Sequence, residues 1–129
     1  MSLEYARVLW ERATNALRSA EALLMVSSDD TASRAYYAAF HAASAAFELE
    51  QRSFRRHTEL RAAVHRDWVK SGMWPVELGA DFDALLELRD VGDYGGTHHV
   101  GPEDAAAAVQ AARRVLDAIR SRCPELDKP

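Results

Sequence analysis

The sequence predicts an all-α protein, an antiparallel up-and-down bundle of four to five helices. Apolar residues recur every three or four positions through most of the 129-residue chain, which is the period of an amphipathic helix. No stretch alternates apolar and polar residues as a half-buried strand does. Short breaks separate the periodic segments, and short connections place consecutive helices side by side in opposite directions.

The first two helices are expected over residues 3–25 and 31–50. An apolar seam from Leu9 to Leu23 follows the helical period in the first of them. The Ser-Ser-Asp-Asp run at 27–30 ends this pattern and supplies capping residues for the second helix.

The second helix carries two distinct stripes. One is apolar and consists of Tyr36, Phe40, Ala43 and Phe47. The other has a hydrogen-bonding group at every position and consists of Arg34, Tyr37 and His41. Such a helix is either a core helix with a satisfied polar network or one wall of a site.

A loop over residues 51–57, anchored by Phe54, is expected to lead into three further helices. These helices span residues 58–70, 75–91 and 102–122. The last two begin with a proline, which the first turn of a helix tolerates best. Between them, residues 92–101 form the one long irregular segment, in which two consecutive glycines permit a positive φ.

Length and composition are those of one soluble globular domain. Hydrophobic residues make up 48% of the chain and charged residues 28%, which is typical of a chain with a buried core. We expect one domain over residues 1–123 and a disordered tail over 124–129. There is no secretion signal, no apolar run long enough for a bilayer, and one cysteine. A cytoplasmic protein with no membrane partner is therefore expected.

A second polar set lies at the end of the fourth expected helix. Arg89 and Asp93 are spaced i, i+4, so they can pair along the helix or meet the Arg34, Tyr37 and His41 stripe across the bundle. A guanidinium at a helix end can bind two phosphate oxygens at once. The alternative is a structural ion pair that ties the helix to the following loop, and residue types alone favour that alternative.

The five histidines do not form a metal-binding pattern. None has a glutamate three residues before it, so we expect no metal and no cofactor. Acid–base chemistry needs only one histidine, and His41, His98 or His99 can serve. We expect a core hydrogen bond for His41 and plain solvent exposure for the two loop histidines.

Charge is distributed unevenly along the chain. The net charge of −4 argues against a whole-surface affinity for nucleic acid. Residues 51–70 include six basic and two acidic residues, whereas residues 71–100 include one basic and six acidic residues. The two segments either neutralise each other within the fold or present two patches to two partners. We favour the first interpretation, because charged runs are usually just solvated.

Two motifs point to a known family. Ser33-Arg34-x-Tyr36-Tyr37-Ala38 and Arg89-x-x-x-Asp93-Tyr94, joined by a loop that carries His57, resemble the small stand-alone HEPN-domain proteins of bacteria and archaea. The resemblance covers nearly the whole chain, including the Gly-Pro-Glu-Asp-Ala start of the last helix. It implies an up-and-down helical bundle, often a homodimer. It also implies frequent operonic pairing with a minimal nucleotidyltransferase, as in toxin–antitoxin modules.

Many HEPN members look like metal-independent ribonucleases. Their motif is an arginine, a polar residue, and a histidine after four to six intervening residues. Arg89 and Asp90 match the first half of this motif. Asp93 and Tyr94 occupy the region expected for the histidine, whereas His98 follows Arg89 after eight intervening residues. The chain therefore departs from the ribonuclease pattern at the acid–base residue.

The leading hypothesis is a homodimeric helical module that binds a minimal nucleotidyltransferase, RNA or a nucleotide. Arg89 would bind phosphate, and Asp90 and Asp93 would orient it or contact the partner. The supporting residues would be Arg34, Tyr37, His41 and Tyr94.

Two other hypotheses stand beside it. In a ribonuclease, Arg89 would stabilise the pentavalent phosphate and His98 would move the proton of the attacking 2′-hydroxyl. In a purely structural interaction bundle, Arg34, Arg89 and Asp93 would form only a buried network. The functional hypotheses require Arg34 and Arg89 to converge on one place in the fold.

Overall fold

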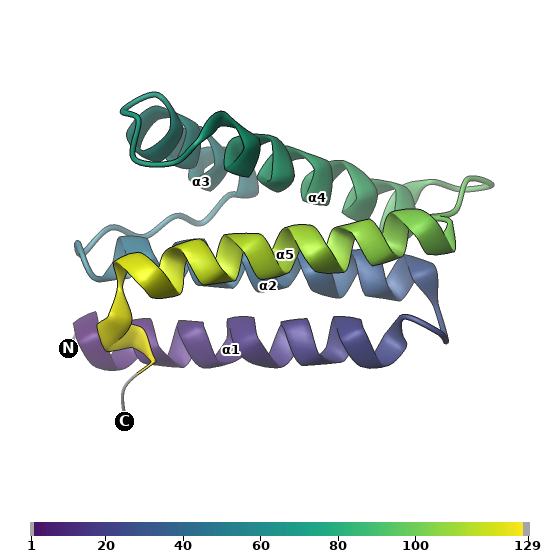
Figure 1. Cartoon of the computed structure of the whole chain (residues 1–129), viewed down its shortest axis with the longest axis horizontal. Coiled ribbons are helices and arrows are strands. Elements are labelled where there is room, and N and C mark those ends of the chain that lie inside the picture. The colour runs from purple at the N-terminus through teal and green to yellow at the C-terminus, as the bar shows by residue number, and fades with distance from the viewer. Residues whose placement is uncertain (1, 128–129) are drawn as a thin grey trace.

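The computed structural model describes residues 2–127, and all regular structure within them is helical (Figure 1). The long helices are α1 (Ser2–Leu23), α2 (Ser28–Glu48), α4 (Val76–Tyr94) and α5 (Pro102–Arg122). The short helix α3 (His57–Ala63) continues into a π-helical segment, η1 (Val64–Val69), and a 3₁₀ turn, η2 (Pro124–Leu126), follows α5. The predicted all-α bundle is confirmed. No helix within residues 2–127 is long and apolar enough to cross a membrane.

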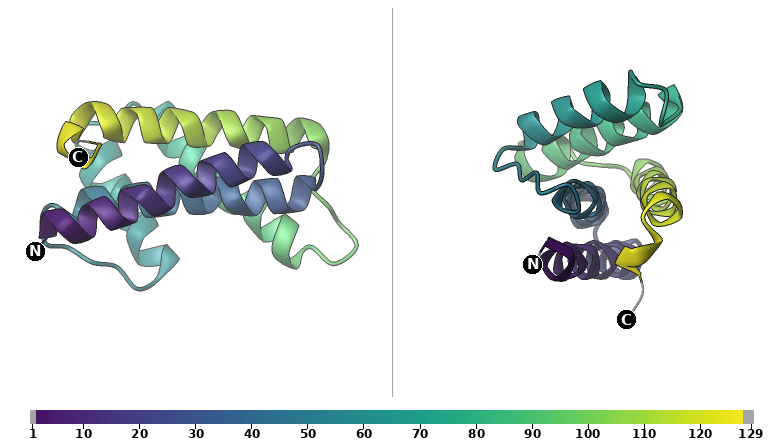
Figure 2. Two further views of the ribbon diagram at one scale, coloured as in Figure 1. Left: turned by 90° about the horizontal axis from the view of Figure 1, so that it is seen from below. Right: turned by 90° about the vertical axis from the view of Figure 1, so that its left-hand side faces the viewer.

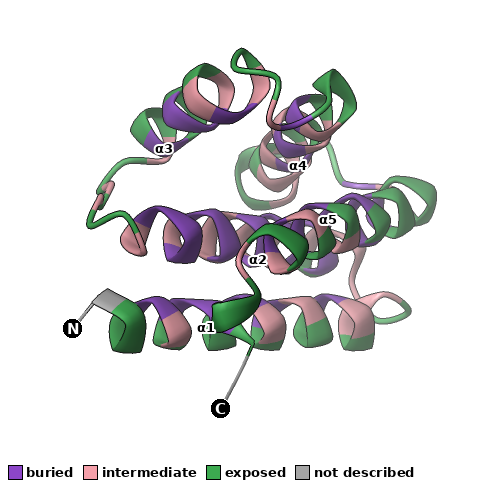
Figure 3. Cartoon of the chain, turned by 60° about the vertical axis from the view of Figure 1, so that its left-hand side comes forward, coloured by how far each residue is buried: buried purple, intermediate pink, exposed green. Residues whose placement is uncertain are grey.

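Helix α2 lies at the centre of the bundle. It contacts α1, α3, α4 and α5. Helix α1 covers one side of α2, and α3 and α4 lie on the opposite side (Figures 1 and 2). Buried residues therefore occur along most of the length of α2 (Figure 3).

The sequence of α2 explains both where it begins and how it packs. Ser27 caps the helix, because its Oγ accepts a hydrogen bond from the Asp30 backbone N–H at 3.2 Å. Asp29 and Asp30 place negative charge at the positive end of the helix dipole. Alanines then occupy most of the buried positions, and their small side chains allow neighbouring helices to approach closely.

An aromatic cluster closes the end of the bundle where α2 finishes. The Phe47 ring stacks on Trp68 at 4.5 Å between centroids, and Trp68 lies 4.8 Å from Trp74. Phe54 packs edge-on against Phe47 at 5.0 Å, so it anchors the loop as expected. The tryptophans Trp68 and Trp74 are buried in this cluster, which gives them a packing role.

Several elements differ from the sequence expectation: α1 ends two residues before its expected end, and α2 begins three residues before its expected start. The helix expected over residues 58–70 is α-helical only to Ala63, and the π segment that follows is marked by an i→i−5 hydrogen bond from Lys70 N to His65 O of 2.8 Å. The wide π turn accompanies a contact with α4, where His65 Nε2 lies 2.9 Å from Asp83 Oδ1. Helix α4 also runs to Tyr94, three residues beyond its expected end.

The tail expected to be disordered over 124–129 is ordered up to residue 127. Leu126 is buried against the core, with 3% of its surface exposed. Trp10 Nε1 donates a hydrogen bond to Asp127 Oδ1 at 3.1 Å, and Arg7 Nε donates to the Glu125 carbonyl at 3.0 Å. These contacts with α1 stabilise a segment whose local sequence gives no sign of them. Residues 128–129 lie outside the described part of the chain.

Gly92 marks the place where α4 touches the start of α2. A Cβ atom at this position would lie 2.8 Å from the backbone carbonyl oxygen of Asp29. Neither backbone can move away without disturbing the helix to which it belongs. The close approach places the last turn of α4, and with it Asp93, beside the first turns of α2.

We expect Gly92→Ala to lower the free energy of unfolding by about 1–3 kcal/mol, the usual cost of overpacking. This loss of stability should appear even though alanine is about 1 kcal/mol more favourable than glycine within a helix. Chemical denaturation measures it. Gly101→Ser is the matched control, because a Cβ at Gly101 meets no atom within 4 Å and serine caps helices well. Equal stability of the two variants would contradict the close contact.

Candidate functional site

A cluster of polar and aromatic side chains lies where α2, α4 and the start of α3 meet. We call it the Arg89 cluster, and its members are Tyr36, Tyr37, His57, Arg89, Asp90, Asp93 and Tyr94. Arg89 is at its centre, with 12% of its side chain exposed. Its Nη2 donates a hydrogen bond to Tyr37 Oη at 3.0 Å, and its Nη1 donates to Asp90 Oδ1 at 3.1 Å.

The third side of the guanidinium is incompletely paired. Arg89 Nε lies 3.2 Å from Asp93 Oδ2, within ion-pair distance. The atom is nevertheless buried without a hydrogen bond of acceptable geometry, whereas Ser33 Oγ donates to the same Asp93 oxygen at 3.4 Å. A buried N–H donor without an acceptor costs free energy. Arg89 therefore keeps an unused hydrogen-bonding capacity.

Aromatic rings surround the Arg89 cation. Its Cζ lies 5.6 Å from the Tyr36 ring centroid, 5.5 Å from that of Tyr37 and 5.3 Å from that of Tyr94. Cation–π attraction offsets part of the cost of removing the charge from water. Burial by itself lowers the pKa of Arg89, but Tyr37, Tyr94 and Asp90 outweigh it and the pKa is raised. The side chain is a permanent cation.

The structure brings Arg34 and Arg89 to the same ring. Arg34 Cζ lies 5.0 Å from the Tyr37 centroid, and Arg89 also contacts that ring and hydrogen-bonds its hydroxyl. One tyrosine thus joins two arginines from helices that are far apart in the sequence. This is the convergence on which the functional hypotheses depend.

Tyr36 and His57 form a hydrogen-bonded pair that the sequence did not single out. Tyr36 is fully buried, and its Oη lies 2.6 Å from His57 Nδ1. Burial strongly raises the pKa of Tyr36, and burial together with the Arg89 charge lowers the pKa of His57. The phenol therefore stays protonated and donates a hydrogen bond to Nδ1 of a neutral imidazole. The imidazole hydrogen is then on Nε2. Helical spacing placed Tyr36 on the apolar stripe, and only the loop that joins the two motifs hinted at His57.

The other predicted histidines lie elsewhere. His41 is half-buried, but its side chain has no hydrogen-bond partner among residues 2–127. The core hydrogen bond expected for His41 is therefore absent from this part of the chain. Burial, together with Arg12 and Arg34, lowers its pKa. His98 is exposed on the loop after α4. His99 is 70% exposed, yet its Nδ1 lies 2.8 Å from Asp29 Oδ2, so plain exposure does not describe it.

The loop that carries His98 is fastened to the start of α2. Asp29 Oδ1 accepts a hydrogen bond from the Val100 backbone N–H at 2.7 Å, while its other oxygen contacts His99. These two bonds lower the pKa of Asp29. The loop is thereby held at the start of α2, and within the described residues His98 makes no contact with Arg89.

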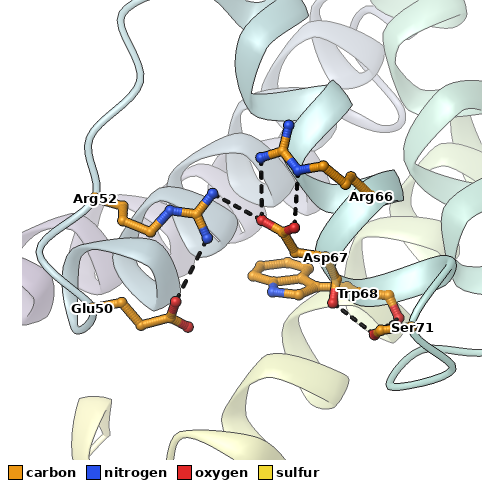
Figure 4. Close-up of polar contacts among 6 residues, drawn as sticks. All are labelled: Glu50, Arg52, Arg66, Asp67, Trp68 and Ser71. Atoms are coloured by element: carbon orange, nitrogen blue, oxygen red, sulfur yellow. Dashed lines mark hydrogen bonds and ion pairs between the residues drawn. The ribbon is translucent and has the colours of Figure 1, made fainter.

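The basic segment is partly neutralised within the fold. Arg52 lies 2.8 Å from Asp67 and 3.6 Å from Glu50, and Arg66 pairs with the same Asp67 (Figure 4). Arg61 reaches Asp83 of the acidic segment at 2.6 Å. Two arginines just before His57, Arg55 and Arg56, are exposed and form no ion pair within residues 2–127. Within the same residues, no group of three or more His, Cys, Asp or Glu side chains is placed to hold a metal ion.

Comparison with known proteins identifies the family. The HEPN domain profile matches residues 6–122. The chain belongs to the HEPN family. A UPF0332 protein of Thermotoga maritima is 33% identical over 127 residues, which is 98% of this chain and 94% of the relative. A UPF0332 protein of Gloeobacter violaceus is 28% identical over 84% of this chain and 87% of its own length.

A solved structure supports the fold of this HEPN protein. TT1696 from Thermus thermophilus superposes with a TM-score of 0.75, covering 91% of this chain and 97% of the other, at 20% identity. At that identity the likeness concerns the fold alone. The HEPN resemblance predicted from the two motifs is confirmed, while the roles of the Arg89 cluster residues stay predictions.

The histidines predict how stability depends on pH. The pKa values of His41 and His57 in the folded protein lie below the ordinary 6.5, so the unfolded chain binds protons first as pH falls. Their contribution is complete above about pH 6.5 and is lost as pH falls through the lower folded values. Urea denaturation between about pH 7 and 5 should therefore show decreasing stability. His57→Asn should flatten the profile, and His98→Asn is the control that should not. Identical slopes in both variants would contradict the buried, neutral His57.

Proposed function

We propose that this HEPN protein binds the phosphate of RNA or of a nucleotide at the Arg89 cluster. The observation that carries the proposal is the state of Arg89, a nearly buried cation whose Nε makes no hydrogen bond, fixed in place by the Tyr37 hydroxyl and three aromatic rings. A guanidinium held in this way is ready to bind phosphate oxygens through its planar fork. Because its orientation is already fixed, little further ordering is needed when a ligand binds.

An exchange of anions is the proposed binding step. The Asp90 side chain is 53% exposed and is held by a single contact to Arg89, so it can leave the guanidinium at low cost. A phosphate would take its place, and Arg34, Arg55 and Arg56 would add positive charge around it. Asp90 and Asp93 weaken the local field, so binding should be moderate and salt-sensitive.

Arg89→Ala should reduce affinity for a fluorescently labelled single-stranded RNA by about tenfold or more, the effect of losing a charge-assisted hydrogen bond. Asp90→Asn should increase affinity, because it removes the competing anion. Fluorescence anisotropy at low salt measures both. Arg114→Ala is the matched control, since Arg114 hydrogen-bonds Asp81 at 2.8 and 3.0 Å on a face outside the cluster.

Folding must be separated from binding in this experiment. Arg89→Lys keeps the charge and loses the fork, so a folded Lys variant with weakened binding supports the proposal. A Lys variant that is folded and retains full affinity contradicts it, as does wild-type protein that binds neither RNA nor nucleotides. If Arg89→Ala loses a few kcal/mol of stability and no variant changes RNA binding, the purely structural bundle is the correct description.

Ribonuclease activity is the second candidate, favoured by one observation. A neutral imidazole, His57, lies in the same cluster as the Arg89 guanidinium, as acid–base cleavage of RNA requires. RNA incubated with the protein in EDTA tests this. Cleavage that disappears in Arg89→Ala and His57→Asn would support an enzyme centred on His57. Cleavage lost only in His98→Asn would support the loop histidine instead. If the wild-type protein cleaves no RNA, the ribonuclease hypothesis is excluded and the binding proposal is unaffected.

Self-association and a partner complete the proposal. Membership of the HEPN family supports a homodimer. From the resemblance of the two motifs we further propose that this dimer pairs with a minimal nucleotidyltransferase in a cytoplasmic toxin–antitoxin-type system. Light scattering should give twice the 14.4 kDa chain mass. Co-expression with a minimal nucleotidyltransferase encoded beside this gene should yield a stable complex. A monomer, or two proteins that elute separately, would contradict these parts without affecting the test of Arg89.

A further inference from the structure

A groove with aromatic walls lies beside the Arg89 cluster. It encloses about 190 Å³ between the first half of α1, the second half of α2 and the loop that leaves α2. Three rings line it, those of Tyr5, Phe40 and Phe54. Its polar lining includes Arg12, His41 and Glu48.

Phe40 joins the groove to the Arg89 cluster. The Phe40 ring lines the groove, and its centroid lies 4.5 Å from that of His57. On the same helix, His41 lines the groove and its ring centroid lies 6.0 Å from that of Tyr37, the tyrosine that holds Arg89. One or two side chains therefore separate the groove from the Arg89 cluster.

Polar groups of the groove have unused hydrogen-bonding capacity. Glu48 Oε2 accepts from Ser53 Oγ at 2.9 Å, and Oε1 has no hydrogen-bond partner within residues 2–127. Within the same residues, the Arg12 side chain forms no hydrogen bond or ion pair, and the His41 imidazole forms no hydrogen bond. The groove thus offers a carboxylate acceptor, a guanidinium donor, and an imidazole with one donor and one acceptor when neutral.

Size and chemistry together restrict the ligand. The volume is smaller than the roughly 300–1,000 Å³ of sites for drug-sized molecules, so the groove accommodates one ring system. Aromatic walls select a flat ring, and donors beside acceptors select a ring with both on its edge. Unpaired RNA bases have this character and are commonly bound by stacking on aromatic residues with hydrogen bonds to their edges.

We propose that this groove binds a single unstacked nucleobase of the strand whose phosphate lies at Arg89, and that Glu48 selects bases with an exocyclic amine. The proposal rests on the proposed function, since it assigns the base site next to the phosphate site. Adenine, guanine and cytosine carry such an amine and can donate to the free Glu48 oxygen. Uracil has no exocyclic amine, and its one donor on this edge, the N3–H, lies between two carbonyl oxygens that the carboxylate would repel.

Nucleosides test the groove separately from the phosphate site, because they contain a base and no phosphate. In NMR titrations of the wild-type protein, adenosine, guanosine and cytidine should bind saturably and more tightly than uridine. Tyr5→Ala should weaken binding about 5- to 100-fold, the range for one stacking contact. Tyr5 is 48% exposed, so this variant should fold. Phe54→Leu, which keeps apolar packing against Phe47, should have a similar effect.

Glu48→Gln should remove the preference over uridine, whereas Glu59→Gln, an exposed carboxylate of α3 outside the groove, should not. Arg89→Ala should leave nucleoside binding unchanged while RNA binding falls, so the two proposals fail separately. No saturable nucleoside binding, binding that ignores both Tyr5→Ala and Phe54→Leu, or uridine binding as tight as that of the other nucleosides would overturn the inference.

Discussion

The structure depends on the burial of α2 among the other helices. A helix that is covered by several neighbours must carry small side chains wherever those neighbours come close, and α2 does so through its alanines. Its few large side chains then mark the places where space remains. Tyr36, Tyr37 and Phe40 are grouped at one such place, so the packing constraint that builds the core also creates the site.

Arg89 is placed against this aromatic surface at an energetic cost. Removing a guanidinium from water is unfavourable unless other groups replace the lost hydration. Two carboxylates, a tyrosine hydroxyl and three rings replace it only in part, because Nε is left without a hydrogen bond. The incomplete hydrogen bonding of Arg89 has two explanations. Either it is one imperfect contact in a structural network, or a bound ligand completes the hydrogen bonds of the guanidinium.

The two faces of α2 around Phe40 suit different parts of one molecule. One face packs against the fixed Arg89 cation of α4, and the adjoining groove has aromatic rings beside hydrogen-bonding side chains. A nucleotide contains both a phosphate and a base, so it offers one group to the cation and another to the groove. The net charge of −4 is compatible with this arrangement, because recognition of a single strand needs a local cation and stacking surfaces rather than a basic surface overall.

The sequence by itself determined the helical class, most helix boundaries and the family. Periodicity, capping residues and proline positions are local signals, and the two motifs are read directly from the chain. The i, i+4 pair of Arg89 and Asp93 was visible for the same reason, since both residues lie on one helix.

Only the tertiary structure decided which side chains meet across helices. Periodicity assigned Tyr36 to the core but did not show that its hydroxyl would face His57, 21 residues later. It did not show that Leu126 and Asp127 would pack on α1, or that Asp29 would bind His99 and the Val100 backbone in the loop after α4. These contacts depend on helix crossing, and the crossing is set by packing volumes summed over the whole core rather than by any local pattern.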